Sequence, residues 1–499
     1  MKEENKLFDN WLLASSIALI AYLIYRLTDQ AKMLWYFPLD FANDVSSYMA
    51  QLHFLKVCGF HQACPYWYNG FVTFKFSPPG WYFINYPLYS LWNNVHAVTY
   101  ISMVLMLISG FLIFYYLGRL AKLSKIKRIA FFALFFGNAS AIGNFIRLGR
   151  VHELLSWLFF IILFFMLYYY KDKKIDKKFY LTGVLYSLVI LSYHSTGVLA
   201  SFLWLGFLLT RETAKERIKT IFSSVLGLAL SSFWLIPFVA NIFHESAIPY
   251  LKQGTWIWNL AINNLWINIS ALVAPLACLI LFYLYYKGSN RDKKNLLFFL
   301  PTIIFAFLFL IRVTPLFPIF NQMYPDPIVH YLFFFSIFFL LSLDLKALTT
   351  KRQQLLFKLI FLVSVTSIIV SLTHTPLFHT PDTQIDKEFI SYIPLLNERF
   401  VIVGNNTGPV YSRAYYSFAA TMNKNSISGW YPEEKSYSYI SRLSAVHSSF
   451  NQGNCTMFKE ELAYFNTTEV LAIKPFCERL KGCNLKEVKS GNSTCLYHI

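Results

Sequence analysis

The chain has 499 residues, of which 56% are hydrophobic and 14% charged, and its mean hydropathy is +0.44. A water-soluble domain usually carries about 25% charged residues, so this composition excludes an ordinary soluble protein and indicates a membrane protein. The net charge of +18 could suggest nucleic-acid binding, but most Lys and Arg lie in short clusters between apolar segments. No basic domain or recognition motif accompanies them, so we expect no nucleic-acid partner.

Apolar segments recur along the first 375 residues. The first follows a polar stretch, residues 1–10, and ends at Arg26 without a small-residue cleavage site, so we expect it to stay as an anchor. A span needs about 20 apolar residues, and this criterion predicts about eleven transmembrane helices. The predicted spans are 11–28, 97–118, 129–146, 153–170, 179–193, 195–210, 218–243, 266–286, 295–312, 329–345 and 355–373.

The connections between these spans alternate in charge. Segments 119–128, 171–178, 211–219, 287–294 and 346–352 are rich in Lys and Arg, whereas 29–96, 244–265 and 313–328 contain few. Basic loops stay in the cytoplasm, so the N-terminus is predicted inside and the C-terminal tail outside, on the extracytoplasmic face of a cell membrane.

The long first outside loop, residues 29–96, contains two carboxylates just before a helical pattern. Asp40 and Asp44 precede Ser46–Lys56, where apolar residues recur at helical spacing and predict an amphipathic helix lying in the membrane interface. Carboxylates four residues apart can share a divalent cation such as Mg²⁺ or Mn²⁺, or bind one substrate hydroxyl. The alternative is that Asp44 only caps the helix while Asp40 is solvated.

Aromatic residues and prolines are dense in the rest of this loop. Dense aromatic surfaces pack against the CH faces of sugars and against isoprenoid chains, so the loop predicts a substrate groove. An interfacial aromatic belt without a ligand is the alternative. The candidate substrate-binding residues here are His53, Trp67, Tyr82 and Tyr86.

A charged sequence lies at the predicted outer junction of the third and fourth helices. It comprises Arg147, Arg150, His152 and Glu153. Charges near the bilayer need a partner, and Arg binds phosphate in a bidentate manner, so we expect a lipid-phosphate site. An internal Arg150–Glu153 ion pair is the alternative. Weaker polar candidates on the outer side are His194, His244, Glu245, Asp326 and His330, although a lone histidine in a membrane is more often a structural hydrogen-bonding group.

The tail, residues 376–499, returns to ordinary polarity. Short strand-like runs at Phe400–Val403 and Val470–Ile473 predict a small α+β or mostly β extracytoplasmic domain, separate from a membrane domain over residues 1–375. Six of seven cysteines fall on the predicted outer side in even numbers per segment, which predicts disulfides, with the pairing in the tail left open. These are Cys58 and Cys64 in the first loop, and Cys455, Cys477, Cys483 and Cys495 in the tail. Candidate N-glycosylation sites in the tail are Asn405, Asn454, Asn466 and Asn492.

The chain resembles the GT-C class of multi-spanning glycosyltransferases, and within it the prokaryotic membrane proteins labelled 6-pyruvoyl-tetrahydropterin synthase-related. The residues that carry the resemblance are Asp40–Asp44, Pro65-Tyr66-Trp67 with Gly70, Pro78-Pro79 with Tyr86-Pro87-Leu88, Gly149-Arg150-Val151-His152-Glu153 and Ser428-Gly429-Trp430-Tyr431-Pro432. The resemblance implies transfer of a sugar from a polyprenyl- or dolichyl-phosphate carrier to a glycan, lipid or protein acceptor on the outer face. It also implies that an acidic residue in the first outside loop acts as base or metal ligand. The chain departs from this pattern because no acidic dipeptide follows its first helix.

The expected mechanism assigns acceptor activation to Asp40 or Asp44, with a divalent cation shared by the two carboxylates. Arg147 and Arg150 would stabilise the leaving lipid phosphate. Two other classes are considered: a transporter or flippase of lipid-linked glycans, which would use a midplane cavity and internal repeats, and a non-enzymatic surface or assembly protein.

Overall fold

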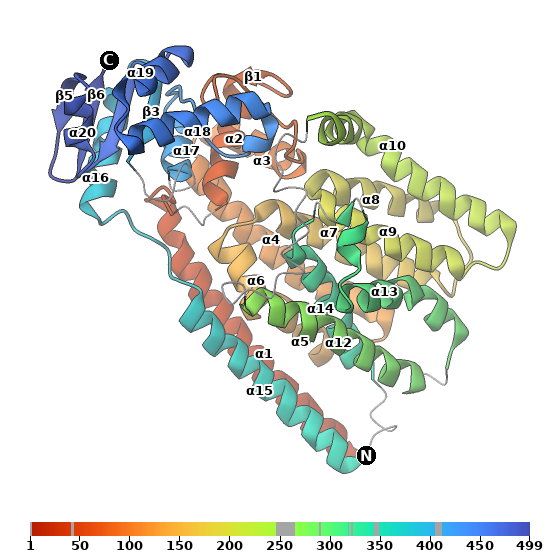
Figure 1. The fold of residues 1–499 in the computed structure, drawn as a ribbon. Coiled ribbons are helices and arrows are strands. Elements are labelled where there is room, and N and C mark those ends of the chain that lie inside the picture. The colour runs from red at the N-terminus through yellow and green to blue at the C-terminus, as the bar shows by residue number, and fades with distance from the viewer. Residues whose placement is uncertain are drawn as a thin grey trace. The chain divides into compact units, whose positions relative to one another are not determined.

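The computed structural model describes residues 2–40, 44–245, 265–288, 291–317, 319–320, 323–343, 349–404 and 412–499. The chain forms two compact units (Figure 1). Unit 1 comprises 1–28, 103–236 and 249–376, and unit 2 comprises 29–102, 237–248 and 377–499. The first loop therefore belongs to the same compact unit as the tail, whereas the predicted division placed it with the membrane domain over residues 1–375.

Unit 1 is built from helices that carry the predicted spans. They are α1 (Lys2–Gln30), α4 (Val95–Leu117), α5 (Lys125–Phe136), α6 (Ala139–Ala141), the π-helical turn η3 (Ile142–Arg147), α7 (Val151–Tyr170), α8 (Leu181–Ser192), α9 (His194–Leu209), α10 (Ala214–Glu245), α12 (Leu265–Gly288), α13 (Lys293–Leu310), α14 (Pro325–Leu341) and α15 (Thr350–His374). Short 3₁₀ turns are η2 (Gly118–Ala121), η4 (Lys177–Tyr180) and η7 (Thr314–Leu316). The last turns of α1 and α10 and the first of α4 lie in unit 2.

Each of the eleven predicted segments overlaps a helix, but not every helix is long enough to span a bilayer alone. The described residues contain seven helices that are long and apolar enough to cross a membrane, or eight if the bent pair of α5 with 139–147 is one span. Helices α9 and α14 are apolar but shorter. The chain thus has the character of a multi-pass membrane protein, while the count of eleven and the orientation stay predictions.

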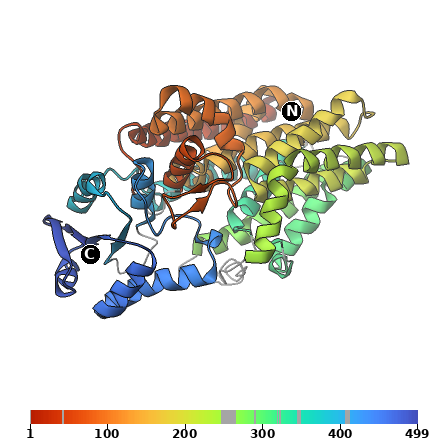
Figure 2. The same ribbon diagram turned by 90° about the horizontal axis from the view of Figure 1, so that it is seen from above.

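Aromatic packing holds the centre of unit 1 together. Phe164 on α7 lies 5.0 Å from both Phe334 and Phe338 on α14, measured between ring centroids. Helices α9 and α13 approach closely where Gly206 faces Phe298, because a Cβ at Gly206 would lie 2.0 Å from the Phe298 carbonyl oxygen. Seen from above, the helices drawn in yellow and green, which come from the middle of the chain, lie side by side (Figure 2).

Helices α1 and α15 come from the two ends of the membrane region and pack against each other. The Tyr22 hydroxyl donates to Ser371 Oγ at 2.8 Å, and Arg26 donates to the carbonyl oxygens of Thr375 and Pro376 at 2.8 and 2.7 Å. A buried arginine side chain needs hydrogen-bond acceptors. These two carbonyl oxygens therefore explain how the charged Arg26 is tolerated within an apolar helix.

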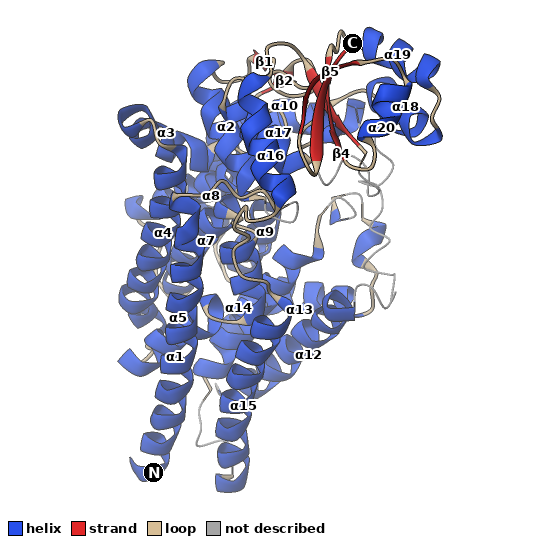
Figure 3. Ribbon diagram, turned by 90° about the vertical axis from the view of Figure 1, so that its left-hand side faces the viewer, coloured by secondary structure: helices blue, strands red, loops and turns tan. Residues whose placement is uncertain are grey.

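Unit 2 contains a mixed sheet with helices around it (Figure 3). The strands are ordered β3-β4-β6-β5, with β3 parallel to β4 and the remaining pairs antiparallel. Their bounds are β3 Phe400–Val403, β4 Glu469–Ile473, β5 Lys486–Ser490 and β6 Thr494–His498. The helices of the tail are α16 (Gln384–Tyr392), α17 (Arg413–Thr421), α18 (Tyr437–Gln452), α19 (Cys455–Tyr464) and α20 (Cys477–Gly482), with 3₁₀ turns η10 (Ile393–Leu395) and η12 (Pro432–Glu434). The tail is therefore α+β, and both predicted strands are confirmed.

The first loop supplies η1 (Ala31–Leu34), α2 (Val45–Val57), α3 (Gly80–Trp92) and the short hairpin β1 (Ala63–Cys64) with β2 (Phe71–Val72) to the same unit. Its aromatic residues enter the core of the tail: Phe54, Trp67 and Phe71 belong to one buried cluster with strand residues such as Val401 and Leu471. The rings of Phe54 and Trp67 meet edge to face at 4.8 Å between centroids.

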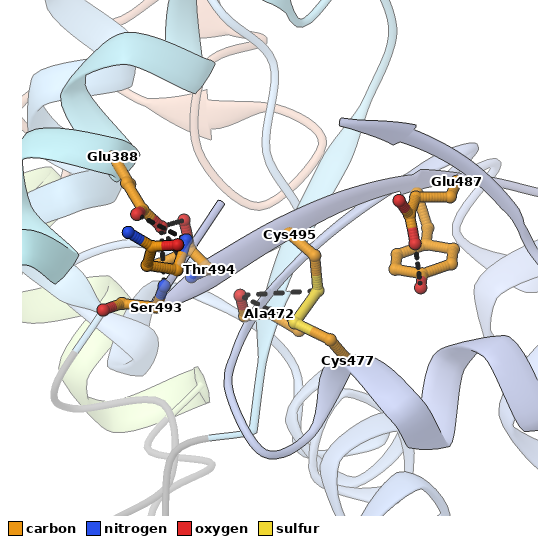
Figure 4. Close-up of a disulfide and its surroundings, with 9 residues drawn as sticks. Glu388, Ala472, Cys477, Glu487, Ser493, Thr494 and Cys495 are labelled. Atoms are coloured by element: carbon orange, nitrogen blue, oxygen red, sulfur yellow. Dashed lines mark hydrogen bonds between the residues drawn. A yellow bond between two sulfur atoms is a disulfide. The ribbon is translucent and has the colours of Figure 1, made fainter. Parts of the chain in front are cut away.

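Three disulfides brace unit 2. They join Cys58 with Cys64, Cys455 with Cys483, and Cys477 with Cys495. The prediction that six cysteines pair is confirmed, and the structure supplies the tail connectivity that the sequence left open. Figure 4 shows the Cys477–Cys495 bond beside Glu388, whose carboxylate accepts from the backbone of Ser493 and Thr494.

Candidate functional site

Helix α2 carries a polar stripe through the interior of unit 2. Asp44, Ser47 and Gln51 are separated by three and four residues, so their side chains project from one face of the helix. All residues from Val45 to Leu55 are buried, including Ser47 and Gln51, which are 0% exposed. The predicted helix is therefore confirmed, but the expectation that one face is exposed at the membrane interface is wrong. The tail covers the face that the sequence left open.

Tyr431, from the tail, faces this stripe. Its hydroxyl lies 3.4 Å from Ser47 Oγ. Burial raises the pKa of Tyr431 well above its usual value, and the negative charges of Asp44 and Glu433 raise that pKa further, while Ser47 and Gln51 act in the opposite direction. Ser47 Oγ also donates to the Asp44 backbone carbonyl at 2.7 Å, so the start of α2 lies beside the tyrosine hydroxyl. This hydroxyl keeps its proton at neutral pH and serves as a hydrogen-bond donor.

Tyr82, on α3, lies on the same side of the first loop. It is fully buried, its hydroxyl is 3.4 Å from Ser77 Oγ, and its pKa is raised first by burial and then by the neighbouring Tyr431. Tyr82, one of the predicted substrate-binding residues, therefore lies in the interior of unit 2.

The backbone at Tyr431 is held in an unfavourable conformation. Its φ of 61° lies in the left-handed region, where a bulky residue is strained. Strain of this kind persists only where surrounding contacts impose it, and it is concentrated at functional sites.

Contacts from the first loop impose this conformation. Tyr68 donates from its hydroxyl to the Gly429 carbonyl at 2.7 Å, and Lys435 donates from Nζ to the Gly70 carbonyl at 2.6 Å. The Val72 backbone N–H donates to the buried carboxylate of Glu434. The segment 426–435 is thus fixed to the β1–β2 hairpin on both sides of Tyr431.

Charged groups border the site on the tail side. The Arg413 guanidinium lies 5.4 Å from the centre of the Trp430 ring, a cation–π distance. Burial raises the pKa of Glu433, and the positive charge of Arg413 partly offsets that rise. Arg413, Trp430 and Glu433 therefore form an ionic edge beside Tyr431.

Several predicted substrate-binding residues of the first loop have structural roles instead. Both ring nitrogens of His53 are occupied, by the Tyr89 hydroxyl at 2.9 Å and by Asn423 Oδ1 at 2.8 Å, and burial lowers the pKa of this histidine. Trp67 is 0% exposed and donates from Nε1 to the Tyr416 carbonyl at 3.3 Å. Tyr86 lies on the exposed face of α3. Most of the aromatic residues expected to line a groove are core residues of unit 2.

The carboxylates proposed for catalysis differ in what surrounds them. Asp44 and Asp40 are both half-buried, and the Asp44 backbone is linked through Ser47 to Tyr431, while residues 41–43 lie outside the described part of the chain. As the residue preceding α2, Asp44 makes no capping bond with its side chain, so it is not the simple helix cap that was considered as the alternative. Within the described ranges, no three His, Cys, Asp or Glu side chains come together as a metal site. A shared cation at Asp40 and Asp44 stays a prediction.

The second charged site lies wholly in unit 1, at the start of α7. Gly149, with a φ of 64°, turns the chain between η3 and α7, a conformation that favours glycine. Arg147, His152 and Glu153 are buried. Arg150 Nη1 lies 2.9 Å from Asp326 Oδ2 and 3.8 Å from Glu153 Oε2.

The partners of this site come from α14. Asp326 places a second carboxylate beside Arg150, so the excess of positive charge expected from residues 147–153 alone is offset. His330 donates from Nδ1 to the Asp326 carbonyl oxygen at 3.0 Å, and the same nitrogen is 3.7 Å from Glu153 Oε1. The arrangement is a buried ionic network in which Arg150 keeps 15% of its side-chain surface exposed.

Three of the candidate glycosylation sites are described. Asn454, Asn466 and Asn492 are all exposed, whereas Asn405 lies outside the described residues. Exposure is compatible with modification, which remains a prediction.

The sequence alone did not single out Ser47, Gln51, Arg413 or Glu433 as site residues. Ser47 and Gln51 left a readable signal, because they follow Asp44 at the three- and four-residue spacing of one helix face. Arg413 and Glu433 lie far along the chain, and no local pattern links them to α2.

Comparison with known proteins gives similarity at the level of fold. No protein-family model matches the sequence, and no curated protein matches it. Among solved structures, the archaeal oligosaccharyltransferase AglB from Archaeoglobus fulgidus, in complex with an inhibitory peptide and a dolichol-phosphate, matches with a TM-score of 0.53 and 10% identity. That match covers 91% of this chain and 69% of AglB. A second A. fulgidus oligosaccharyltransferase structure, with Zn and sulfate, matches at a TM-score of 0.50 and 12% identity, over 91% of this chain and 68% of the other.

The arabinofuranosyltransferase AftD from Mycobacteria matches with a TM-score of 0.58 and 12% identity. This match covers 96% of the present chain but only 40% of AftD, so the chain corresponds to less than half of that enzyme. At these identities the likeness concerns the fold alone. The chain shares the overall fold of these oligosaccharyltransferase and arabinofuranosyltransferase structures.

Proposed function

We propose that the chain transfers a sugar from a polyprenyl- or dolichyl-phosphate-linked donor to an acceptor on the extracytoplasmic face of the membrane. The observation that carries the proposal is the position of Asp44 on a fold shared with membrane glycosyltransferases: Ser47 Oγ donates to the Asp44 backbone carbonyl at 2.7 Å and lies 3.4 Å from the hydroxyl of the tail residue Tyr431. The supporting structures include one with a dolichol-phosphate bound, which is the donor chemistry proposed here.

Asp44 is the proposed base. A carboxylate within reach of an acceptor hydroxyl takes its proton as the oxygen attacks the anomeric carbon. The bond between that carbon and the phosphate oxygen breaks, and its electron pair stays on the lipid phosphate. The proton then passes from Asp44 to water. Tyr431 keeps its own proton and orients the reacting hydroxyl through a hydrogen bond.

Asp40 is kept as the second candidate for the base. It lies four residues before Asp44, in the half-buried stretch that leads into α2. A divalent cation bound by Asp40 and Asp44 is part of the sequence expectation, but within the described residues the two carboxylates have no third acidic or imidazole ligand.

In unit 1, Arg150 is the proposed contact for the lipid phosphate. Its guanidinium is partly exposed and is held by the carboxylates of Asp326 and Glu153. An arginine held in this way presents its remaining N–H groups in a defined direction, which suits a phosphate.

The test is sugar transfer by the purified full chain in nanodiscs. A panel of polyprenyl-phosphate sugars, labelled in the sugar, is supplied to wild type, Asp44→Asn, Asp40→Asn and the exposed control Asp382→Asn. We expect the loss of a general base to lower the rate of transfer about 10²–10⁴-fold in Asp44→Asn. Wild type and Asp382→Asn should match.

The other outcomes identify alternatives. A loss confined to Asp40→Asn would overturn the assignment of Asp44 and leave the reaction intact. Movement of an intact lipid-linked sugar across the bilayer, without release of lipid phosphate, would replace the proposal by transport. Absence of transfer and of transport across the panel would favour the assembly protein.

A further inference from the structure

The amide of Gln51 is buried in unit 2 without a satisfactory partner. Gln51 is 0% exposed, and neither Nε2 nor Oε1 makes a hydrogen bond of acceptable geometry with a described residue. Gln51 lowers the pKa of the Tyr431 hydroxyl, so the two groups interact, but the geometry of this contact does not meet the criteria of a hydrogen bond. An unsatisfied buried polar group costs about 1–3 kcal/mol, so both ends of an amide are rarely left in this state.

The surroundings of this amide define what would satisfy it. Ser47 and Asp44 precede it on the same face of α2, and the Tyr431 hydroxyl faces that stripe. The Gln51 amide offers a donor and an acceptor side by side. The Ser47 and Tyr431 hydroxyls can each donate and accept a hydrogen bond, and the Asp44 carboxylate accepts. Two adjacent hydroxyl groups of a ligand match this set, because one can donate to Oε1 while the other accepts from Nε2.

Apolar side chains adjoin the stripe on α2. Leu52, Phe54 and Leu55 follow Gln51 along the helix, and all three are buried. The buried amide of Asn85 in the same unit is paired, because it donates to the Trp81 carbonyl oxygen at 2.8 Å. Gln51 differs from Asn85 in facing the candidate site.

We infer that Gln51 is a substrate-binding residue that recognises a pair of adjacent hydroxyl groups on a sugar. The inference rests on the proposed function for its reaction, and it adds the group that selects the sugar. Gln51 would then set which donor or acceptor sugar is used, while Asp44 carries the chemistry.

The test uses Gln51→Leu, which removes the hydrogen-bonding groups and keeps a similar size. Transfer is measured with the best sugar of the donor panel and with its monodeoxy analogues, and likewise with monodeoxy acceptors. With wild type, we expect at least one analogue to lose roughly tenfold or more in kcat/KM, because the amide is then left unpaired. Gln51→Leu should use that analogue and the parent sugar equally well.

Protein stability separates binding from packing. Because the amide is unsatisfied in the free protein, Gln51→Leu should leave Tm unchanged or raise it. Asn85→Leu is the matched control, since it removes a buried amide that has a partner. We expect this control to lower Tm and to keep the wild-type penalty for the deoxy sugar.

The outcomes for Gln51 and for the proposed function can be told apart. Transfer by wild type with the same deoxy penalties in Gln51→Leu would overturn the role of Gln51 and leave the transferase standing. If wild type transfers no sugar, methyl glycosides are tested by saturation-transfer NMR. Binding lost in Gln51→Leu would support the hydroxyl site alone, and binding unchanged, or absent from both proteins, would overturn it.

Discussion

The hydroxyl of Tyr68 donates a hydrogen bond to the backbone carbonyl of Gly429, 2.7 Å away, although 361 residues separate the two in sequence. This bond joins the aromatic part of the first loop to the tail segment that carries Tyr431. Asp44 and Tyr431 therefore belong to one folded unit, and the candidate site exists only when loop and tail fold together.

Gly429→Ala tests that dependence. A Cβ at Gly429 would lie 2.5 Å from Cγ of the buried Trp67 ring, which has no room to move. Overpacking of this kind typically costs about 1–3 kcal/mol, so we expect a lower Tm together with reduced transfer. Gly482→Ala is the control, because a Cβ there meets no atom within 4 Å. Equal Tm values for the two variants would contradict this expectation and would show that Trp67 can move to accommodate the added Cβ at little cost in stability.

Much of the fold could be predicted from local patterns. Apolar length located every helix that carries a span, and β-branched runs located β3 and β4, because these signals depend only on nearby residues. The even distribution of cysteines predicted pairing, but the partners in the tail depend on how α19, α20 and β6 pack.

The site itself was less accessible to sequence reasoning. Asp326 balances Arg150 from 176 residues away, and Tyr431 reaches α2 from the other end of the chain. Trp67 and His53 were expected to bind substrate, yet both are buried by the tail, whose position no local pattern reveals. Residues that act through long-range contacts leave little trace in a single sequence.

Arg150→Ala tests the lipid-phosphate contact in unit 1. We expect binding of decaprenyl phosphate to nanodisc-embedded protein to weaken about tenfold or more, since a charge-assisted hydrogen bond is lost. Asp326→Asn should strengthen binding or leave it unchanged, because it removes a competing anion from Arg150. The exposed Arg352→Ala serves as the control. If Arg150→Ala and Asp326→Asn lower Tm alike without affecting binding, the network is structural.

The two tail disulfides should differ from the loop disulfide in their contribution to stability. Cys455–Cys483 and Cys477–Cys495 close segments of 28 and 18 residues, whereas Cys58–Cys64 closes only 6. Loop entropy then predicts losses of about 3–4 kcal/mol for either tail bond and about 2 kcal/mol for the loop bond on replacement of both cysteines by Ala. Urea unfolding of each double variant measures its loss of unfolding free energy. A larger loss for the Cys58–Cys64 variant than for either tail variant would contradict the prediction.

Glu388 should make the tail sensitive to acid. Burial alone would raise its pKa, but hydrogen bonds from Gln384, Thr494 and the backbone of the 492–494 turn lower the pKa of Glu388 to about 2. Because this value lies below the ordinary 4.5, the ionised carboxylate stabilises the folded state fully above about pH 4.5, and the stabilisation is lost as the pH falls toward 2.

Glu388→Gln should therefore lower the unfolding free energy by about 2 kcal/mol at pH 7, and this deficit should shrink toward pH 2.5. Urea unfolding at several pH values, with hydrogen exchange of residues 488–498 to follow the β5–β6 hairpin, measures the difference. The exposed Glu460→Gln should track wild type throughout. A deficit that stays constant with pH would mean that Glu388 acts through its shape and neutral hydrogen bonds, because only an ionised carboxylate can lose its contribution on protonation.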